Sequence, residues 1–205
     1  MVDDNSPDGT GTLADELTAS TGRVSVLHRP AKTGIGPAYV AGLGAALSGD
    51  ADRIVCMDAD GSHRPVDLPS LLDALDDADI ALGSRYVAGG GSEGWPFHRR
   101  LLSRFGGTYA RVLLGVPITD LTGGFKAYRR EALACLDLAA IRSDGYAFQI
   151  ETTWQALRRG LTVVEVPITF TDRVAGRSKL SRRIVAEAVW TVLRLRLRSW
   201  RGGAG

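Results

Sequence analysis

The sequence contains little cysteine, carries almost no net charge and has no long hydrophobic run. Its two cysteines, Cys56 and Cys135, provide no disulfide framework and are typical of a reducing compartment. No apolar segment approaches the ~18–20 residues that a membrane-spanning helix needs. The net charge of +2 is too small to indicate a nucleic-acid partner. We therefore expect no disulfide scaffold, no spanning helix in this sequence and no nucleic-acid partner.

The residues that are present have an ordinary globular composition, with 44% hydrophobic and 23% charged residues in a chain of 205. A chain of this length buries one sizeable core, which indicates a single domain. Strand-like apolar runs alternate with helical patterns, so we predict an α/β fold with a mostly parallel sheet and helices on both faces. The expected strands are residues 24–27, 53–57, 80–83 and 162–166. The expected helices are residues 12–19, 38–48, 66–75, 99–114, 148–159 and 179–196. Residues 89–94, with four glycines, are expected to form a flexible loop.

Two carboxylates end one of these strands: Asp58 and Asp60 follow the run Ile54-Val55-Cys56-Met57 and flank Ala59. Residues i and i+2 of a strand project to one side, so the pair can hold a single hard cation. An EF-hand loop is excluded, because its sixth position requires Gly and holds His63, and its twelfth requires Glu and holds Pro69. Two acids that merely cap a strand-to-helix turn remain the alternative. The histidines are too scattered for a metal cluster, and His63 is interpreted as a polar loop residue beside the metal site rather than as a ligand.

The first ten residues read as the end of a strand that runs into a turn, and only Val2 remains of that strand. A doubly wound nucleotide-binding sheet normally begins with a full β-α unit before such a point. We therefore expect a first strand and helix to be missing from this sequence. For residues 3–8, a turn built from Asp and Pro chemistry is the alternative to a binding role.

Five segments follow one another in a characteristic order over nearly the whole chain: Val2-Asp3-Asp4-Asn5-Ser6-Pro7-Asp8-Gly9-Thr10, Met57-Asp58-Ala59-Asp60, Gly83-Ser84-Arg85-Tyr86, Asp120-Leu121-Thr122-Gly123-Gly124-Phe125 and Asp172-Arg173-Val174-Ala175-Gly176-Arg177-Ser178-Lys179-Leu180. Together they resemble the dolichol-phosphate (polyprenol-phosphate) mannose synthases, inverting glycosyltransferases of family 2 with the GT-A fold. The family's opening Pro-x-Tyr-Asn-Glu motif, which helps to seat the nucleotide base, is absent from this sequence.

For the donor, the resemblance implies GDP-mannose bound with Mg²⁺ or Mn²⁺. The metal would lie on Asp58 and Asp60, and Ser62 stands where relatives offer a further polar ligand. The loop that carries Arg173 and Lys179 would close over the donor diphosphate, although a basic linker is the alternative for this segment. The implied donor-binding residues are Val2, Asp3, Asp4, Asp58, Ala59, Asp60, Arg85, Arg173 and Lys179.

For the acceptor, the resemblance implies a polyprenyl phosphate held by Arg85, Arg99 and Ser103. The second pKa of a phosphate monoester is about 6, so its oxygen is already nucleophilic at neutral pH and needs positioning more than a base. Asp120 would lie beside the transferred sugar, with Gln149 and Glu151 as neighbours. The implied catalytic residues are Asp58, Asp60, Arg85 and Asp120.

The chain divides by prediction into a GT-A domain, residues 1–180, and a basic amphipathic helix, residues 180–205. Arg194, Arg196, Arg198 and Arg201 of that helix suit an anionic membrane surface, although a core-facing helix is equally compatible. We expect a peripheral place at the cytoplasmic face of the membrane, compatible with a membrane-protein partner. Two alternatives remain: a polyprenyl-phosphate glucosyltransferase or related enzyme that uses a UDP-sugar, and a noncatalytic domain that binds lipid or a partner.

Overall fold

The computed structural model describes residues 1–172 and 182–201. Its centre is a four-stranded sheet in the order β3-β6-β4-β7, formed by Arg53–Cys56, Lys126–Arg129, Ile80–Ser84 and Val163–Pro167. β6 is antiparallel to both β3 and β4, and β7 is parallel to β4, so three of the four strands share one direction. The predicted mostly parallel sheet is confirmed, and the reversed strand β6 is one that the sequence pattern did not reveal.

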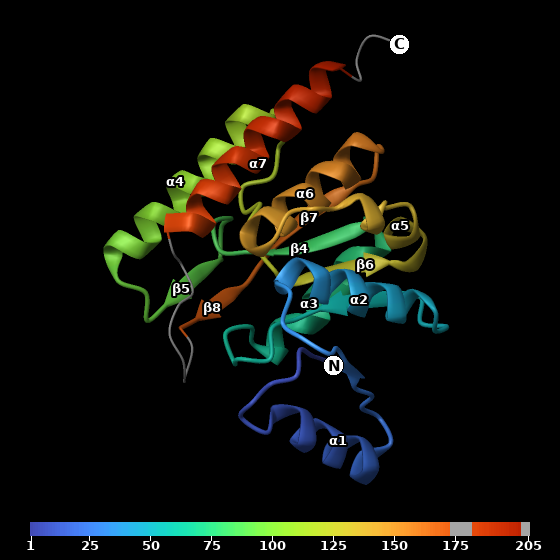
Figure 1. Ribbon diagram of the computed structural model, residues 1–205. Coiled ribbons are helices and arrows are strands. Elements are labelled where there is room, and N and C mark those ends of the chain that lie inside the picture. Colours follow the sequence, from blue (N-terminus) through green and yellow to red (C-terminus); the bar gives the residue numbers. More distant parts are fainter. Residues whose placement is uncertain (173–181, 202–205) are drawn as a thin grey trace.

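Helices cover both faces of this sheet, as predicted (Figure 1). On one face lies α3 (Leu68–Asp73), between the 3-10 turns Pro65–Asp67 and Ala74–Asp76. On the other lie α2 (Ile35–Leu47), α5 (Arg130–Ala134) and α6 (Gly145–Arg158), with a 3-10 turn at Leu138–Ala140. α4 (Phe97–Leu114) and α7 (Arg182–Arg201) run side by side and pack beyond α6.

The core follows the alternation of side chains along the strands. In β4, Ile80 and Leu82 pack toward α6, whereas Ala81 packs toward α3. All five residues of β4 are buried, which is why this strand is an unbroken run of apolar and small residues rather than an alternating one. The same alternation in β6 places Tyr128 under α6 and Ala127 against α3.

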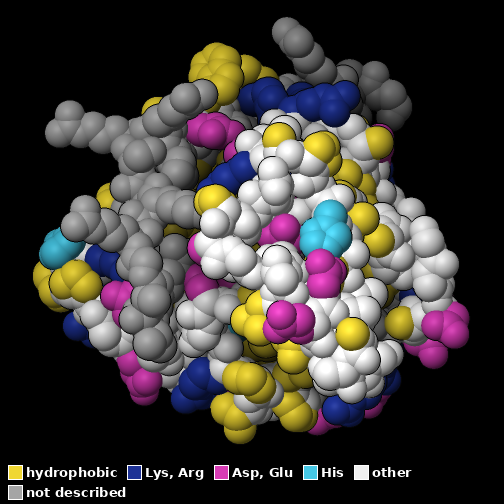
Figure 2. Space-filling view, turned by 60° about the horizontal axis from the view of Figure 1, so that its bottom comes forward, with side chains coloured by type: hydrophobic (Ala, Val, Ile, Leu, Met, Phe, Trp, Pro, Cys, Tyr) yellow, Lys and Arg dark blue, Asp and Glu magenta, His cyan; other side chains and the backbone are white. Residues whose placement is uncertain are grey.

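Two small parallel sheets stand apart from the central one. β1 (Val2–Asp3) pairs with β2 (Leu27–His28), and α1 (Thr10–Thr21) connects them at the lower end of the molecule in Figure 1. β5 (Gly91–Glu93) pairs with β8 (Thr169–Thr171). A cavity of about 370 Å³ separates β1 from β3, with walls from Val2, α2 and residues 54–59. On the face shown in Figure 2, hydrophobic side chains are interspersed with charged ones of both signs.

Two local predictions are wrong. Residues 91–93 lie in the expected flexible loop, yet they form β5, because their backbone pairs in register with residues 169–171. Residues 24–26 are not in a strand, because only Leu27 and His28 pair in register with β1. Both errors concern pairing with distant segments, which local composition does not encode.

α7 belongs to the core on one side and faces outward on the other. Val192 and Leu195 are fully buried against α4 and α6, whereas Trp190 and Leu197 are 65% and 58% exposed. The core-facing reading of this helix therefore holds for one face. An interfacial role for the exposed face and the division of the chain at residue 180 stay predictions. In residues 1–172 and 182–201, no helix is long and apolar enough to span a bilayer.

Candidate active site

A cavity of about 280 Å³ lies beyond the ends of β3 and β4, and the first turns of α2 and α6 form part of its wall. We call it the central cavity. In open α/β sheets, ligands bind at this carboxyl edge of the strands. The cavity is lined by Lys32, Gly34, Ile35, Tyr39, Asp58, His63, Gly83, Arg85, Trp95, Arg99, Thr122, Gly123, Gly124, Asp144, Gly145, Tyr146, Gln149, Ile168, Phe170 and Glu187.

Asp58 and Asp60 lie in the turn after β3, where the sequence predicted them. The Tyr39 hydroxyl donates to Oδ1 of Asp58 at 3.1 Å, and the Asp58 backbone N–H donates to Nδ1 of His63 at 3.0 Å. Oδ1 of Asp60 accepts the backbone N–H of Ser62 at 3.0 Å and also its hydroxyl. These hydrogen bonds hold both carboxylates in a fixed turn rather than on a free loop.

This donor set fits a divalent cation that is shared with a substrate. Mg²⁺ in proteins is commonly held by one or two carboxylates together with substrate phosphates and water. In the described part of the chain, no three His, Cys, Asp or Glu side chains are grouped to hold a metal alone. Ser62 is fully buried and supports Asp60, and its role as a direct ligand stays a prediction.

His63 lies in the turn beside Asp58, as interpreted from the sequence, and the structure adds that it is buried there. It is 4% exposed, and its ring stacks on Phe125 with centroids 5.0 Å apart and meets Phe170 edge-on at 5.4 Å. Burial lowers the pKa of His63 despite the nearby carboxylates Asp58 and Asp60, which favours the neutral ring. A neutral ring leaves Nδ1 able to accept the Asp58 N–H and hold the turn.

Arg85 and Asp120 form a buried ion pair beside the cavity. Nε and Nη2 of Arg85 donate to the two carboxylate oxygens of Asp120, each at 2.7 Å, and the side chains are 6% and 1% exposed. Burial opposes the charge, but the attraction of Asp120 outweighs it and raises the pKa of Arg85. Thr122 adds bonds to both partners. These contacts favour Asp120 as the residue that positions Arg85 rather than as a direct sugar ligand.

The three predicted acceptor residues, Arg85, Arg99 and Ser103, line one apolar cavity of about 130 Å³ between α4, α6 and α7. The guanidinium of Arg99 lies 4.2 Å over the Trp95 ring and pairs with Asp172 at 2.8 Å. Ser103 accepts a hydrogen bond from the Tyr86 hydroxyl at 2.6 Å. The apolar cavity adjoins the central cavity, because both are lined by Arg85, Trp95, Arg99, Thr122 and Tyr146.

The predicted donor-binding residues Val2, Asp3 and Asp4 do not line the central cavity. Val2 faces the cavity beside β3, together with Asp58 and Ala59. Asp3 is 5% exposed and accepts the Ser6 N–H at 3.3 Å, while Asp4 pairs with Arg29 at 2.7 Å. Their role in nucleotide binding therefore stays a prediction. Arg173 and Lys179 lie outside the described residues.

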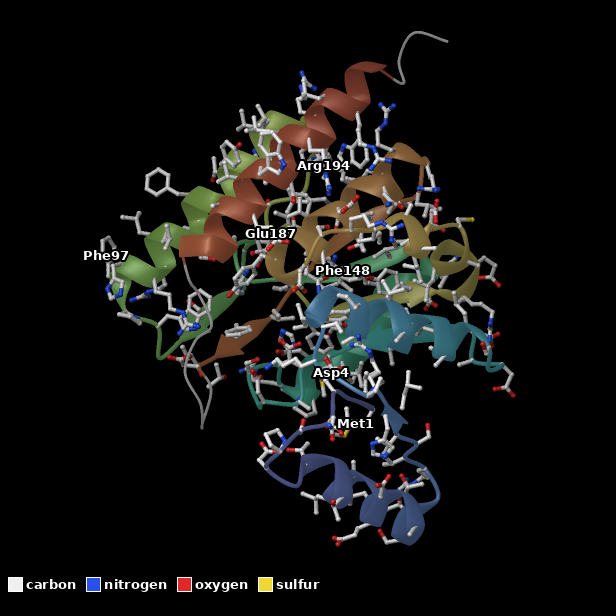
Figure 3. All side chains as sticks on the ribbon, viewed as in Figure 1. Met1, Asp4, Phe97, Phe148, Glu187 and Arg194 are labelled. Atoms are coloured by element: carbon white, nitrogen blue, oxygen red, sulfur yellow. The ribbon has the colours of Figure 1, made fainter. Side chains whose placement is uncertain are left out.

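Sequence reasoning missed the polar contacts that join α2, α6 and α7 at the central cavity. Oδ1 of Asp144 accepts the N–H groups of Gly36 at 2.6 Å and Gly145 at 2.8 Å. Oε1 of Glu187 in turn accepts the Asp144 N–H at 3.0 Å, and Figure 3 shows Glu187 between α7 and α6. One signal was available, because Asp before Gly at a helix start is a good N-cap, whereas the predicted helix began only at residue 148.

Gln149 and Glu151, expected as neighbours of the sugar, separate in the structure. Gln149 lines the central cavity. Glu151 is fully buried under α7, where it accepts from Ser143 and lies 3.4 Å from Arg194.

Comparison with known proteins agrees with this geometry. The model of a protein family described as "Glycosyl transferase family 2" matches residues 1–137. The polyprenol monophosphomannose synthase of Mycolicibacterium smegmatis is 54% identical over 194 residues, which are 94% of this chain and 73% of that protein. The undecaprenyl-phosphate mannosyltransferase of Micrococcus luteus is 49% identical over 203 residues, which are 98% of this chain and 84% of that protein.

Solved structures of glucosyl-3-phosphoglycerate synthase from Mycobacterium tuberculosis share the fold. The complex with Mn²⁺ and UDP-glucose matches with a TM-score of 0.65 at 21% identity, and the complex with Mg²⁺ and UDP with 0.64 at 20%. Each match covers 95% of this chain and 66% of the solved one. At this level of identity, the likeness establishes the GT-A architecture and nothing more specific.

Proposed function

The chain belongs to glycosyl transferase family 2, and from this premise we propose that it transfers mannose from GDP-mannose to a polyprenyl phosphate with inversion at the anomeric carbon. The two named relatives are a polyprenol monophosphomannose synthase and an undecaprenyl-phosphate mannosyltransferase, and this chain spans most of both. Two parts of the proposal, the choice of GDP as the nucleotide and the inversion at the anomeric carbon, are based on the resemblance of the five ordered segments to the family.

One observation carries the proposal: a cavity lined by Asp58 of the carboxylate pair meets an apolar cavity at a buried arginine. Asp58 lines the first cavity, Ser103 lines the second, and Arg85 lines both. This arrangement suits a charged donor on one side and a phosphate with an apolar chain on the other. The reacting groups then meet at Arg85, where Asp120 and Thr122 hold the guanidinium in place.

Arg85 and Arg99 position the acceptor phosphate and offset its charge, and no residue needs to remove a proton from it. The acceptor phosphate is largely dianionic at neutral pH, so Arg85 and Arg99 need only orient its oxygen toward the anomeric carbon and offset its charge. Planar guanidinium groups suit this task because they donate two parallel hydrogen bonds to a phosphate. Trp95, which lies under Arg99, and Asp172, which pairs with it, restrict where that guanidinium can lie.

Asp58 and Asp60 would hold Mg²⁺ or Mn²⁺ together with the donor diphosphate. Such an ion, when bound, neutralises the charge that grows on the departing nucleotide. The chain's own part is to fix the two carboxylates, through Tyr39 on Asp58 and Ser62 on Asp60. Arg173 and Lys179 are proposed to add positive charge at the same diphosphate.

We place the enzyme at the surface of the membrane that carries its acceptor. Apolar side chains exposed on α4 include Phe97 at 72% and Phe105 at 66%, and α7 beside it exposes Trp190 and Leu197. In Figure 3, Phe97 projects outward from the start of α4. The cytoplasmic face is supported by the free thiols of Cys56 and Cys135.

The test is transfer of radiolabelled mannose from GDP-mannose to a short polyprenyl phosphate in the presence of Mn²⁺. We expect a lipid-linked product, and Asp60→Ala should abolish it with little change in melting temperature. UDP-glucose in place of GDP-mannose is the matched control for donor choice. If GDP-mannose gives no lipid-linked product, the proposal is wrong, and a product from UDP-glucose alone would support the UDP-sugar alternative instead. If Asp60→Ala unfolds the chain, the carboxylates are structural.

A further inference from the structure

A further cavity of about 410 Å³ lies between residues 90–92 and the first two turns of α4, and the proposed reaction does not use it. We call it the arginine cavity. On α4 its wall consists of Phe97, Arg100, Leu101 and Arg104. These positions follow the spacing i, i+3, i+4 and i+7, so they share one face of the helix. The cavity is therefore bounded by a continuous helix face that combines two cations with two apolar side chains.

Arg100 and Arg104 carry charges that no carboxylate balances in the part of the chain whose side chains the structure describes. Both residues are exposed. Residues four apart on a helix are neighbours, so two like charges there repel each other. The adjacent Arg99 differs, because it pairs with Asp172 at 2.8 Å. An anion between Arg100 and Arg104 would therefore relieve a repulsion, whereas at Arg99 it would have to displace a carboxylate.

The rest of the wall orients one of these arginines and adds a neutral polar group. The guanidinium of Arg104 lies 5.4 Å from the centre of the Tyr86 ring, and the Tyr86 hydroxyl donates to Ser103 at 2.6 Å, which fixes the ring. Ser92 adds its hydroxyl group to the cavity lining. Guanidinium groups and a hydroxyl group are donors that match the oxygens of a phosphate.

The apolar side chains favour an amphiphilic anion over a free one. Phe97 and Leu101 are 72% and 44% exposed beside the arginines, and Phe97 projects outward from the start of α4 in Figure 3. A free phosphate gains nothing from exposed apolar side chains, whereas the acyl chains of a phospholipid would cover them. Basic side chains at a bilayer surface are also attracted to anionic lipids. The combination therefore fits an anionic phospholipid.

We propose that the arginine cavity binds the phosphate of an anionic phospholipid between Arg100 and Arg104, with the acyl chains along the apolar part of the same helix face. This site is separate from the one assigned to the acceptor, where Arg99 and Ser103 line the apolar cavity. The inference rests on the proposed place of the enzyme at a membrane surface, not on the transfer reaction, and it gives that surface a specific lipid contact.

The experiment measures the binding of dihexanoyl-phosphatidylglycerol, a short-chain lipid kept below its micelle concentration, by titration calorimetry. We expect one bound lipid per chain, and Arg100→Gln combined with Arg104→Gln should weaken its binding about thirtyfold. Glycerol phosphate represents the free anion and should bind at least about tenfold more weakly, because it lacks acyl chains. Arg23→Gln combined with Arg158→Gln is the matched control, since it removes two exposed arginines outside α4 and should leave lipid binding unchanged.

A second measurement separates the lipid site from the acceptor site. Transfer of mannose to a short polyprenyl phosphate without phospholipid should stay unchanged in the Arg100→Gln, Arg104→Gln chain, because the apolar cavity keeps Arg85 and Arg99. Arg85 also lines the arginine cavity, but Asp120 already neutralises it, so the variants leave it in place. Loss of this transfer would assign the two arginines to the acceptor and contradict a separate lipid site.

The outcomes also separate this inference from the proposed function. The lipid site alone is wrong if the unsubstituted chain transfers mannose but binds no short-chain lipid, or if both double variants weaken the lipid equally. Glycerol phosphate that binds as tightly as the lipid would likewise contradict a lipid site. A chain that binds the lipid but transfers no mannose would overturn the proposed transfer and support the lipid site.

Discussion

The Arg85–Asp120 pair is almost entirely removed from water, and this burial determines what each partner tolerates. Asp120→Asn would leave the guanidinium buried without a counter-charge, which costs about 3–5 kcal/mol. We expect the melting temperature to fall by on the order of 10 °C, since ~1 kcal/mol corresponds to ~2–4 °C at this size. Calorimetric unfolding measures this change.

A double variant tests the cause of that loss. In Arg85→Met with Asp120→Leu, no buried charge is left alone, so stability should recover while mannosyl transfer stays lost. A double variant as unstable as Asp120→Asn would show that packing, rather than the unpaired charge, sets the cost.

Lys126 gives the fold a measurable pH dependence. Burial lowers its pKa to about 7, from an ordinary value of 10.5. Between these values the unfolded chain binds more protons than the folded one, so the contribution of Lys126 to the free energy of unfolding rises with pH. From pH 7 to 9 we expect the native chain to gain about 2 kcal/mol relative to Lys126→Met.

Denaturant unfolding of both chains at each pH measures this difference. The comparison with Lys126→Met removes the titration of other groups, which both chains share. A difference that stays constant from pH 7 to 9 would mean that the acceptors Gln149, Thr152 and Thr153 hold Lys126 as an ammonium throughout.

At the scale of whole elements, the hydrogen bond between α7 and the start of α6 is connected to the central cavity, where we propose that the donor binds. Glu187→Ala removes the acceptor of the Asp144 N–H, and Asp144 in turn holds the first turn of α2 through Gly36. We expect the melting temperature to drop by about 2–4 °C and the KM for GDP-mannose to rise. Glu187→Gln keeps an acceptor oxygen and should restore both, whereas an effect as large as that of alanine would assign the role to charge.

The sequence predicted the elements whose signal is local. The strand β4 and the carboxylates after β3 could be predicted from the sequence. A strand buried on both faces is a continuous apolar run, and the carboxylate pair has an i, i+2 spacing, so both signals lie in neighbouring residues. β6 was missed, because Lys126 and Arg129 interrupt its apolar character, although Lys126 is buried among polar acceptors of α6.

The candidate site divides in the same way. Asp58 and Arg85 follow strands and were found, whereas Tyr39 and Glu187 reach the site from helices that only tertiary packing brings there. The role of Asp120 was read incompletely for the same reason, since its partner Arg85 lies 35 positions away in the chain.

For the molecule as a whole, the proposed acceptor cavity predicts a particular orientation on the membrane. The apolar cavity lies between α4 and α7, and these helices expose Phe105 and Trp190 at 66% and 65%. Arg100 and Arg104 lie on the same helix as Phe105. An anionic bilayer would therefore attract this surface of the protein through its arginines and bury the exposed apolar side chains of the same surface. A prenyl chain entering from that bilayer would reach Arg85 without crossing water.

Phe105→Ser combined with Trp190→Ser should therefore weaken binding to vesicles that contain phosphatidylglycerol by about a hundredfold or more, because burying each large apolar side chain is worth ~1.5–3 kcal/mol and ~1.4 kcal/mol is a factor of ten. Flotation at two salt concentrations measures this binding, which should decrease with salt in both chains because the arginines remain. Leu13→Ser is the matched control, since Leu13 is 59% exposed on α1, away from α4 and α7. GDP-mannose affinity should stay unchanged, while transfer to a long polyprenyl phosphate in vesicles falls. Equal loss in Leu13→Ser, or no loss in the double variant, would contradict this orientation.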